Sequence, residues 1–188
     1  MIWDGEATGV GAPFCRVTAV DENTVWYISP RQTPDSRLST DGGETWTEFP
    51  LPDDLEIANI VAILLRSSKD GYLLYEGGDL YVTADAGQNW NKILLPLGHH
   101  DEMKLEAMEG STLGAIRFSD SENGIVIVSI FGAGDSKVIA LTTKDGGQTW
   151  QEEIVSTKMG TTYLTRDGVY LTIVSITGKI TVFRHNID

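Results

Sequence analysis

The sequence predicts an all-β fold, a small β-propeller of about four four-stranded antiparallel blades, and three observations lead to that prediction. An octet that ends in Trp occurs three times. A polar turn followed by an apolar strand occurs four times and precedes each octet. The two patterns together recur about every 45 residues, which is the length of one propeller blade of four short strands.

The octet has Ser or Thr first, Asp third, Gly fifth, Thr or Asn seventh and Trp eighth. Its copies are Ser39, Asp41, Gly43, Thr45 and Trp46; Thr83, Asp85, Gly87, Asn89 and Trp90; and Thr143, Asp145, Gly147, Thr149 and Trp150. Each copy lies between two short apolar or β-branched runs, so it predicts the turn of a β-hairpin. The Asp can accept backbone N–H groups, the Gly permits positive φ, and the Trp can be buried between sheets.

The second repeat is a polar turn that ends at Asn23, Asp70, Asn123 or Asp167 and leads into an apolar strand. Such a turn is again a hairpin signal. The expected blades span residues 13–50, 57–96, 112–155, and 160–188 completed by 1–6. The last blade lacks an octet, and the strand at Ile2-Trp3 has no partner of its own. We therefore expect the ring to close when the N-terminal strand pairs with the last blade, which would remove exposed sheet edges.

The octet is the Asp-box, or bacterial neuraminidase repeat, and the chain resembles Asp-box β-propellers over nearly its whole length. That group includes sialidases, xyloglucan-type glycoside hydrolases, sortilin-type receptors and photosystem II assembly factor propellers. The resemblance implies that the boxes are structural turns at the blade periphery, away from any catalytic centre, and it favours an extracytoplasmic or secreted protein. The second box departs from the pattern at Ala86 and Asn89, but Asn also bonds locally, so we expect that turn to be intact.

Composition excludes several classes of function. The 188 residues include 14 Lys plus Arg and 27 Asp plus Glu, a formal net charge of −13. Nucleic-acid and anionic-membrane binders need basic patches, so we expect neither partner.

No stretch is long and apolar enough to span a bilayer, and the N-terminus lacks the features of a signal peptide. Cys15 is the only cysteine, which excludes an intramolecular disulfide, and we expect it to be a small buried strand residue.

Neither catalytic residues nor a cofactor are predicted. The resemblance to sialidases would require an arginine cluster, and the seven arginines of this chain do not occupy the active-site motifs of that family. Abundant carboxylates leave a glycosidase pair open. The adjacent His99 and His100, followed by Asp101, would point to opposite sides of an extended segment, so no metal site is predicted.

The irregular residues predict where a ligand would bind. In a propeller the connections between second and third strands share one face with the blade-to-blade links, and the boxes lie on the other face. The irregular segments of the first face are 29–36, 131–136 and 97–112, of which 101–109 is expected to form a short helix. Because binding residues are concentrated in loops, the candidate ligand-binding residues are Arg31, His99, His100, Phe131 and Asp135.

Three functions remain open from sequence. The favoured one is a non-catalytic, monomeric propeller that binds a protein. The second is a carbohydrate-binding or glycoside hydrolase module, which would make a glycan the ligand. The third is a partial propeller that oligomerises into a larger ring.

Overall fold

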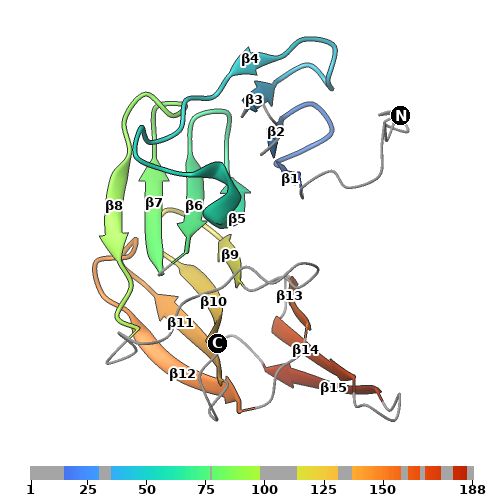
Figure 1. The fold of residues 1–188 in the computed structure, drawn as a ribbon, viewed down its shortest axis with the longest axis vertical. Coiled ribbons are helices and arrows are strands. Elements are labelled where there is room, and N and C mark those ends of the chain that lie inside the picture. Colours follow the sequence, from blue (N-terminus) through green and yellow to red (C-terminus); the bar gives the residue numbers. More distant parts are fainter. Residues whose placement is uncertain are drawn as a thin grey trace.

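The computed structural model describes residues 15–29, 35–76, 78–97, 114–130, 137–157, 161–165, 168–174 and 180–185. These residues form four antiparallel sheets, three of four strands and one of three strands. In each sheet the strands follow one another in chain order, so every strand pairs with its neighbour in sequence (Figure 1). The prediction of an all-β fold made of four-stranded antiparallel sheets is confirmed. The number of blades and the closure by the N-terminal strand remain predictions.

The first sheet contains β1 (Arg16–Ala19), β2 (Val25–Ser29), β3 (Asp35–Ser39) and β4 (Thr47–Glu48). The turn between β1 and β2 is held by the Asp21 carboxylate, which accepts the backbone N–H groups of Asn23 and Thr24 at 2.9 and 2.7 Å. Because the Asp21 carboxylate takes the place of backbone hydrogen-bond acceptors, one strand can end and the next can begin within a few residues.

The second sheet contains β5 (Ile60–Leu65), β6 (Gly71–Tyr75), β7 (Asp79–Thr83) and β8 (Asn91–Leu94), preceded by the short 3-10 helix η1 (Ile57–Asn59). The pairing of β5 with β6 shifts register between Ile60 and Ala62. Val61 is therefore the extra residue of a β-bulge, which locally turns the strand.

The third sheet contains β9 (Gly114–Phe118), β10 (Gly124–Ile130), β11 (Lys137–Thr143) and β12 (Gln151–Ser156). The last sheet contains β13 (Thr161–Thr165), β14 (Gly168–Val174) and β15 (Ile180–His185). The predicted helix at 101–109 and the predicted strand at 1–6 lie outside the described residues.

The four sheets follow one another around an open arc, with β1, β5, β9 and β13 on its inner side (Figure 1). The apolar core lies between successive sheets. One cluster, which includes Trp26, Phe49 and Leu73, joins the first sheet to the second. Another, which includes Leu80, Val126 and Leu141, joins the second to the third. The second sheet is consequently buried on both faces, as expected of stacked blades. The far side of the third sheet is also buried, at Ile125 and Ile127 among others.

Two further observations concern the chain as a whole. In the described part of the chain, no helix is long and apolar enough to cross a membrane. The prediction that Cys15 is buried is wrong, because Cys15 is exposed just before β1. Its side chain lies on the side of the first sheet that faces away from the second sheet, and no described element covers that side.

Candidate functional site

The sheets have two ends, and the chain uses them differently. In each of the first three sheets an Asp-box joins the third strand to the fourth, as between Ser39 and Thr47. The second-to-third strand connections leave from the opposite end, for example between Ser29 and Asp35. The links from one sheet to the next also emerge at that opposite end. We call the two ends the box face and the loop face.

On the box face, the Ser or Thr and Asp side chains of each Asp-box form hydrogen bonds within their own turn. In the first box Ser39 Oγ donates to Asp41 Oδ1 at 2.8 Å, and the Gly43 N–H donates to Ser39 Oγ at 2.8 Å. The Thr45 N–H and hydroxyl donate to the two oxygens of the same carboxylate. The third box repeats the set with Thr143, Asp145, Gly147 and Thr149. The carboxylate therefore acts as the centre of the turn.

The second box keeps this geometry despite its two departures. Asn89 Nδ2 donates to Asp85 Oδ2 at 2.7 Å, where the other boxes have a Thr hydroxyl. Ala86 has φ 60°, although it carries a Cβ; Gly42 and Gly146 occupy the same position at φ 76° and 72°. The turn thus needs two successive left-handed residues, and the sequence pattern identified only the second. Ala86 adopts the conformation at a cost of about 1 kcal/mol relative to Gly.

These hydrogen bonds hold the box carboxylates in the charged form. The Thr45 hydroxyl, followed by the Thr45 N–H, lowers the pKa of Asp41 to about 2, and Thr149 does the same for Asp145. The Asn89 side chain lowers the pKa of Asp85. A general acid must hold a proton near neutral pH, so these three groups are unsuited to proton donation.

The box tryptophans differ in what they bind. Trp46 Nε1 donates to Gly43 O at 3.1 Å and Trp150 Nε1 to Gly147 O at 3.0 Å, both within their own box. Trp90 Nε1 instead donates to Pro50 O of the preceding sheet's exit segment at 3.0 Å. Its ring also lies near those of Trp26 and Phe49. Trp90 therefore connects the second sheet to the first.

On the loop face, Arg16 lies between the inner strands of the first two sheets. Its Nε–H donates to the carbonyl oxygen of Val61, the bulge residue of β5, at 3.1 Å. Burial lowers the pKa of Arg16. In the part of the chain that the structure describes, no carboxylate forms an ion pair with Arg16. A partly buried guanidinium with remaining N–H donors favours an acceptor such as a carboxylate or carbonyl group.

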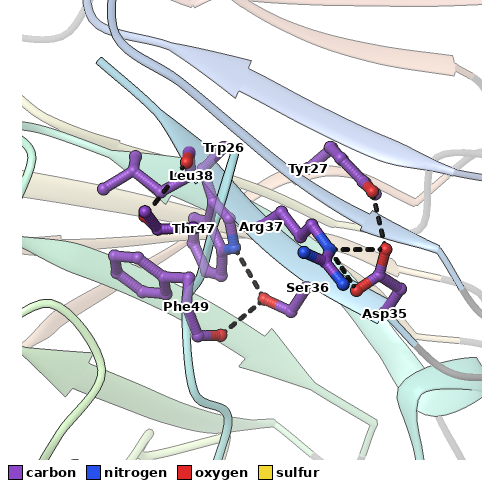
Figure 2. Close-up of polar contacts among 8 residues, drawn as sticks. All are labelled: Trp26, Tyr27, Asp35, Ser36, Arg37, Leu38, Thr47 and Phe49. Atoms are coloured by element: carbon purple, nitrogen blue, oxygen red, sulfur yellow. Dashed lines mark hydrogen bonds and ion pairs between the residues drawn. The ribbon is translucent and has the colours of Figure 1, made fainter. Parts of the chain in front are cut away.

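A second polar group lies at the loop-face end of the first sheet. The Tyr27 hydroxyl donates to Asp35 Oδ2 at 2.7 Å, and Arg37 Nε contacts both oxygens of Asp35, the nearer at 2.8 Å. Figure 2 shows this triad beside the bonds of Trp26 to Ser36 and of Ser36 to the Phe49 carbonyl, which lie on the buried side of the sheet. Burial and the Asp35 bond raise the pKa of Tyr27, so its hydroxyl keeps its proton.

The five predicted ligand-binding residues lie outside the described residues: Arg31, His99, His100, Phe131 and Asp135. The described residues that flank them are at the loop face, where β2 ends at Ser29 and β10 ends at Ile130. Arg16 and the Tyr27, Asp35 and Arg37 triad were not singled out from the sequence as ligand-binding candidates. Arg37 lies opposite Tyr27 and Asp35 lies opposite Ser29, an arrangement that is evident only once the strand pairing is known.

Among the described residues, no group of three or more His, Cys, Asp or Glu side chains is arranged to hold a metal ion. His99, His100 and Asp101, which the sequence analysis considered as a possible metal site, lie outside the described residues.

Comparison with known proteins identifies the repeat. Residues 37–48 match the BNR/Asp-box repeat, which covers the end of β3, the first box and β4. The chain therefore carries this repeat, and the second and third boxes reproduce its hydrogen bonds. No protein of curated function matches the chain.

Two solved structures are similar to the chain. One is described as "YCF48 bound to D1 peptide": it is 18% identical with a TM-score of 0.48, and the match covers 93% of this chain and 55% of that one. The other is "YCF48 from Cyanidioschyzon merolae": 19% identical, TM-score 0.49, covering 89% of this chain and 57% of that one. This chain thus spans little more than half the length of either.

Proposed function

We propose that this chain is a non-catalytic binding propeller that holds a protein partner on its loop face. One observation carries the proposal: the carboxylates of all three boxes accept hydrogen bonds within their own turns, whereas the irregular connections leave the sheets at the opposite end. Binding residues collect on loops that a rigid scaffold positions. The box face is the scaffold in this proposal, and the loop face carries the ligand.

The chemistry of the loop face favours a ligand with acceptor groups. Arg16 offers N–H donors beside the Val61 bulge, and Arg31 is two residues after the end of β2 in the sequence. Arg is enriched in interface hot spots because its planar donors pair with carboxylate and carbonyl oxygens. An extended peptide segment with an acidic residue would meet these requirements.

The finer architecture is part of the same proposal. The chain would form four blades, with residues 1–6 as the fourth strand of the last one. The last sheet has three described strands, one fewer than each of the others, which leaves room for such a strand. An added strand would also cover an exposed sheet edge.

Charge reversal on each face tests the binding proposal. Arg31→Glu, and separately deletion of residues 98–110, should abolish capture of the partner that wild-type protein retains in a pull-down. Lys144→Glu is the matched control, because Lys144 is exposed in the third box on the box face. Equal loss of the partner with Lys144→Glu, or retention with Arg31→Glu, would contradict the proposal.

A carbohydrate ligand is the second candidate, favoured by the Tyr27, Asp35 and Arg37 triad. A phenol paired with a carboxylate beside an arginine resembles the groups that sialidases use. A glycan array and a panel of chromogenic glycosides test it. Binding or hydrolysis that Tyr27→Phe removes would support this candidate, and silence in both assays would eliminate it.

A further inference from the structure

One side of the first sheet has no neighbouring sheet among the described elements. Its strands alternate, so Thr18, Trp26 and Leu38 face the second sheet and the residues between them face away. We call this outward side the end face; its exposed or partly exposed residues include Cys15, Val17, Val25, Tyr27, Arg37 and Trp46, and the buried Ser29 and Ser39 lie on the same side. Val17 is 60% exposed, and Cys15 and Arg37 are exposed as well.

The equivalent positions in the next two sheets are covered. Tyr27, Leu73 and Val126 each lie in the second strand, opposite Arg37, Tyr81 and Leu141 respectively. Leu73 and Val126 are completely buried by the preceding sheet, whereas Tyr27 is partly exposed. The face equivalent to the end face is therefore a sheet-to-sheet interface in both the second and the third sheet.

The boxes show the same difference. A Cβ added to Gly87 would lie 2.3 Å from the Pro50 carbonyl oxygen, and one added to Gly147 would lie 3.1 Å from Ile93 Cδ1. Both neighbours belong to the preceding sheet or its exit segment. At Gly43 the nearest atom is Cζ2 of its own Trp46, at 3.6 Å. The second and third boxes thus rest on a preceding blade, and the first box has the same shape without one.

The last sheet is the natural cover, but within one chain it lies across the open side of the arc (Figure 1). The inner strands contact in the order β1, β5, β9 and β13, and no comparable contact joins the first sheet to the last among the described strands. The β14 sequence, GVYLTIV, is nearly as apolar as GIVIVSI of β10, which is covered on both faces. Such continuous apolar strands are typical of sheets with two covered faces.

We propose that the end face packs against the last sheet of a second copy of this chain, so that two copies close one ring. The inference rests on the four blades proposed above, goes beyond their binding function and changes how the ring closes: residues 1–6 of each copy would complete the last sheet of the other copy. A two-fold axis makes both contacts at once, since the first sheet of each copy meets the last sheet of the other. Sequence spacing alone favoured a monomer, but no sheet in the described part of the chain covers the end face.

Sedimentation velocity tests this inference. We expect wild-type protein to shift from 20.5 kDa to twice that mass between about 1 and about 100 µM. Added salt should strengthen the association, because each copy carries a formal charge of −13 and the contact is apolar. Val17→Asp should remain monomeric with an unchanged unfolding midpoint. Leu94→Asp is the matched control: Leu94 is 73% exposed on the outer strand of the second sheet, so its association should equal that of wild type.

Three outcomes would overturn the inference. A constant mass of 20.5 kDa would show that the chain closes on itself or needs another partner. Masses above two copies would show open-ended assembly rather than a closed pair. Association that Val17→Asp leaves intact would place the contact elsewhere. None of these outcomes would bear on the loop-face proposal, which the Arg31→Glu and Lys144→Glu pair tests separately.

Discussion

The first sheet and the second sheet are built from the same repeat, but among the described elements the second sheet has a sheet on each side and the first sheet has one on a single side. In β6 of the second sheet the residues from Gly71 to Leu74 are all buried. In β2, the equivalent central strand of the first sheet, Trp26 and Ile28 are buried but Val25 and Tyr27 are only partly buried. The difference lies in the neighbouring sheet, because the strand pairing is the same. An Asp-box blade therefore supplies its own turn but depends on an adjacent blade for half of its core.

The largest expected effect is a difference in the free energy of unfolding between alanine variants of two equivalent box glycines, Gly87 and Gly43. Gly87→Ala would place a Cβ against the Pro50 carbonyl at positive φ, so we expect a loss of about 4 kcal/mol in the free energy of unfolding. Gly43→Ala is strained in the same way without the clash, and should lose about 1 kcal/mol. Urea denaturation of both variants measures the difference. Equal losses would contradict the one-sided packing of the first box.

The box tryptophans should differ by a smaller amount. Trp90→Phe removes a hydrogen bond to Pro50 O that joins two sheets and leaves that carbonyl without its donor, at a cost of about 2 kcal/mol. Trp46→Phe removes a bond within one box on the end face, at a cost of about 1 kcal/mol. Thermal unfolding at neutral pH gives both values. A larger loss at Trp46 would show that its ring is more deeply packed than that of Trp90.

Acid should weaken all three boxes alike, which makes it a check that the turns are equivalent. The pKa of Asp41 and Asp145 is about 2 in the folded protein and the pKa of Asp85 is lowered, against about 3.9 for Asp in unfolded chains. Below pH 4 the unfolded chain binds more protons, so this stabilisation should be lost as pH falls from about 4 to about 2.

Urea midpoints measured across that range test the acid effect, and Asp145→Asn should show a shallower decline than wild type. A midpoint that is flat from pH 4 to pH 2 would mean that the box carboxylates are not held as the hydrogen bonds indicate.

Local features were predictable from the sequence, and long-range ones were not. The boxes were predictable because the residues that bond to one another, such as Asp41 and Thr45, are only 4 positions apart in the sequence. The Trp90 bond to Pro50 joins residues 40 positions apart, so no local pattern indicates it. Cys15 was expected to be buried because small apolar residues in strands usually are, but that rule assumes a covered sheet face. The predicted ligand-binding residues remain predictions, since they lie in connections outside the described residues.

The end face carries the only cysteine of the chain, and its reactivity tests the central comparison directly. Cys15 should react with iodoacetamide in dilute protein nearly as fast as in unfolded chain, because it is exposed and no described sheet covers it. The rate should then fall as the protein concentration rises and a second copy covers the end face. Slow labelling at the lowest concentration would contradict the account, because it would show that the chain covers its own first sheet.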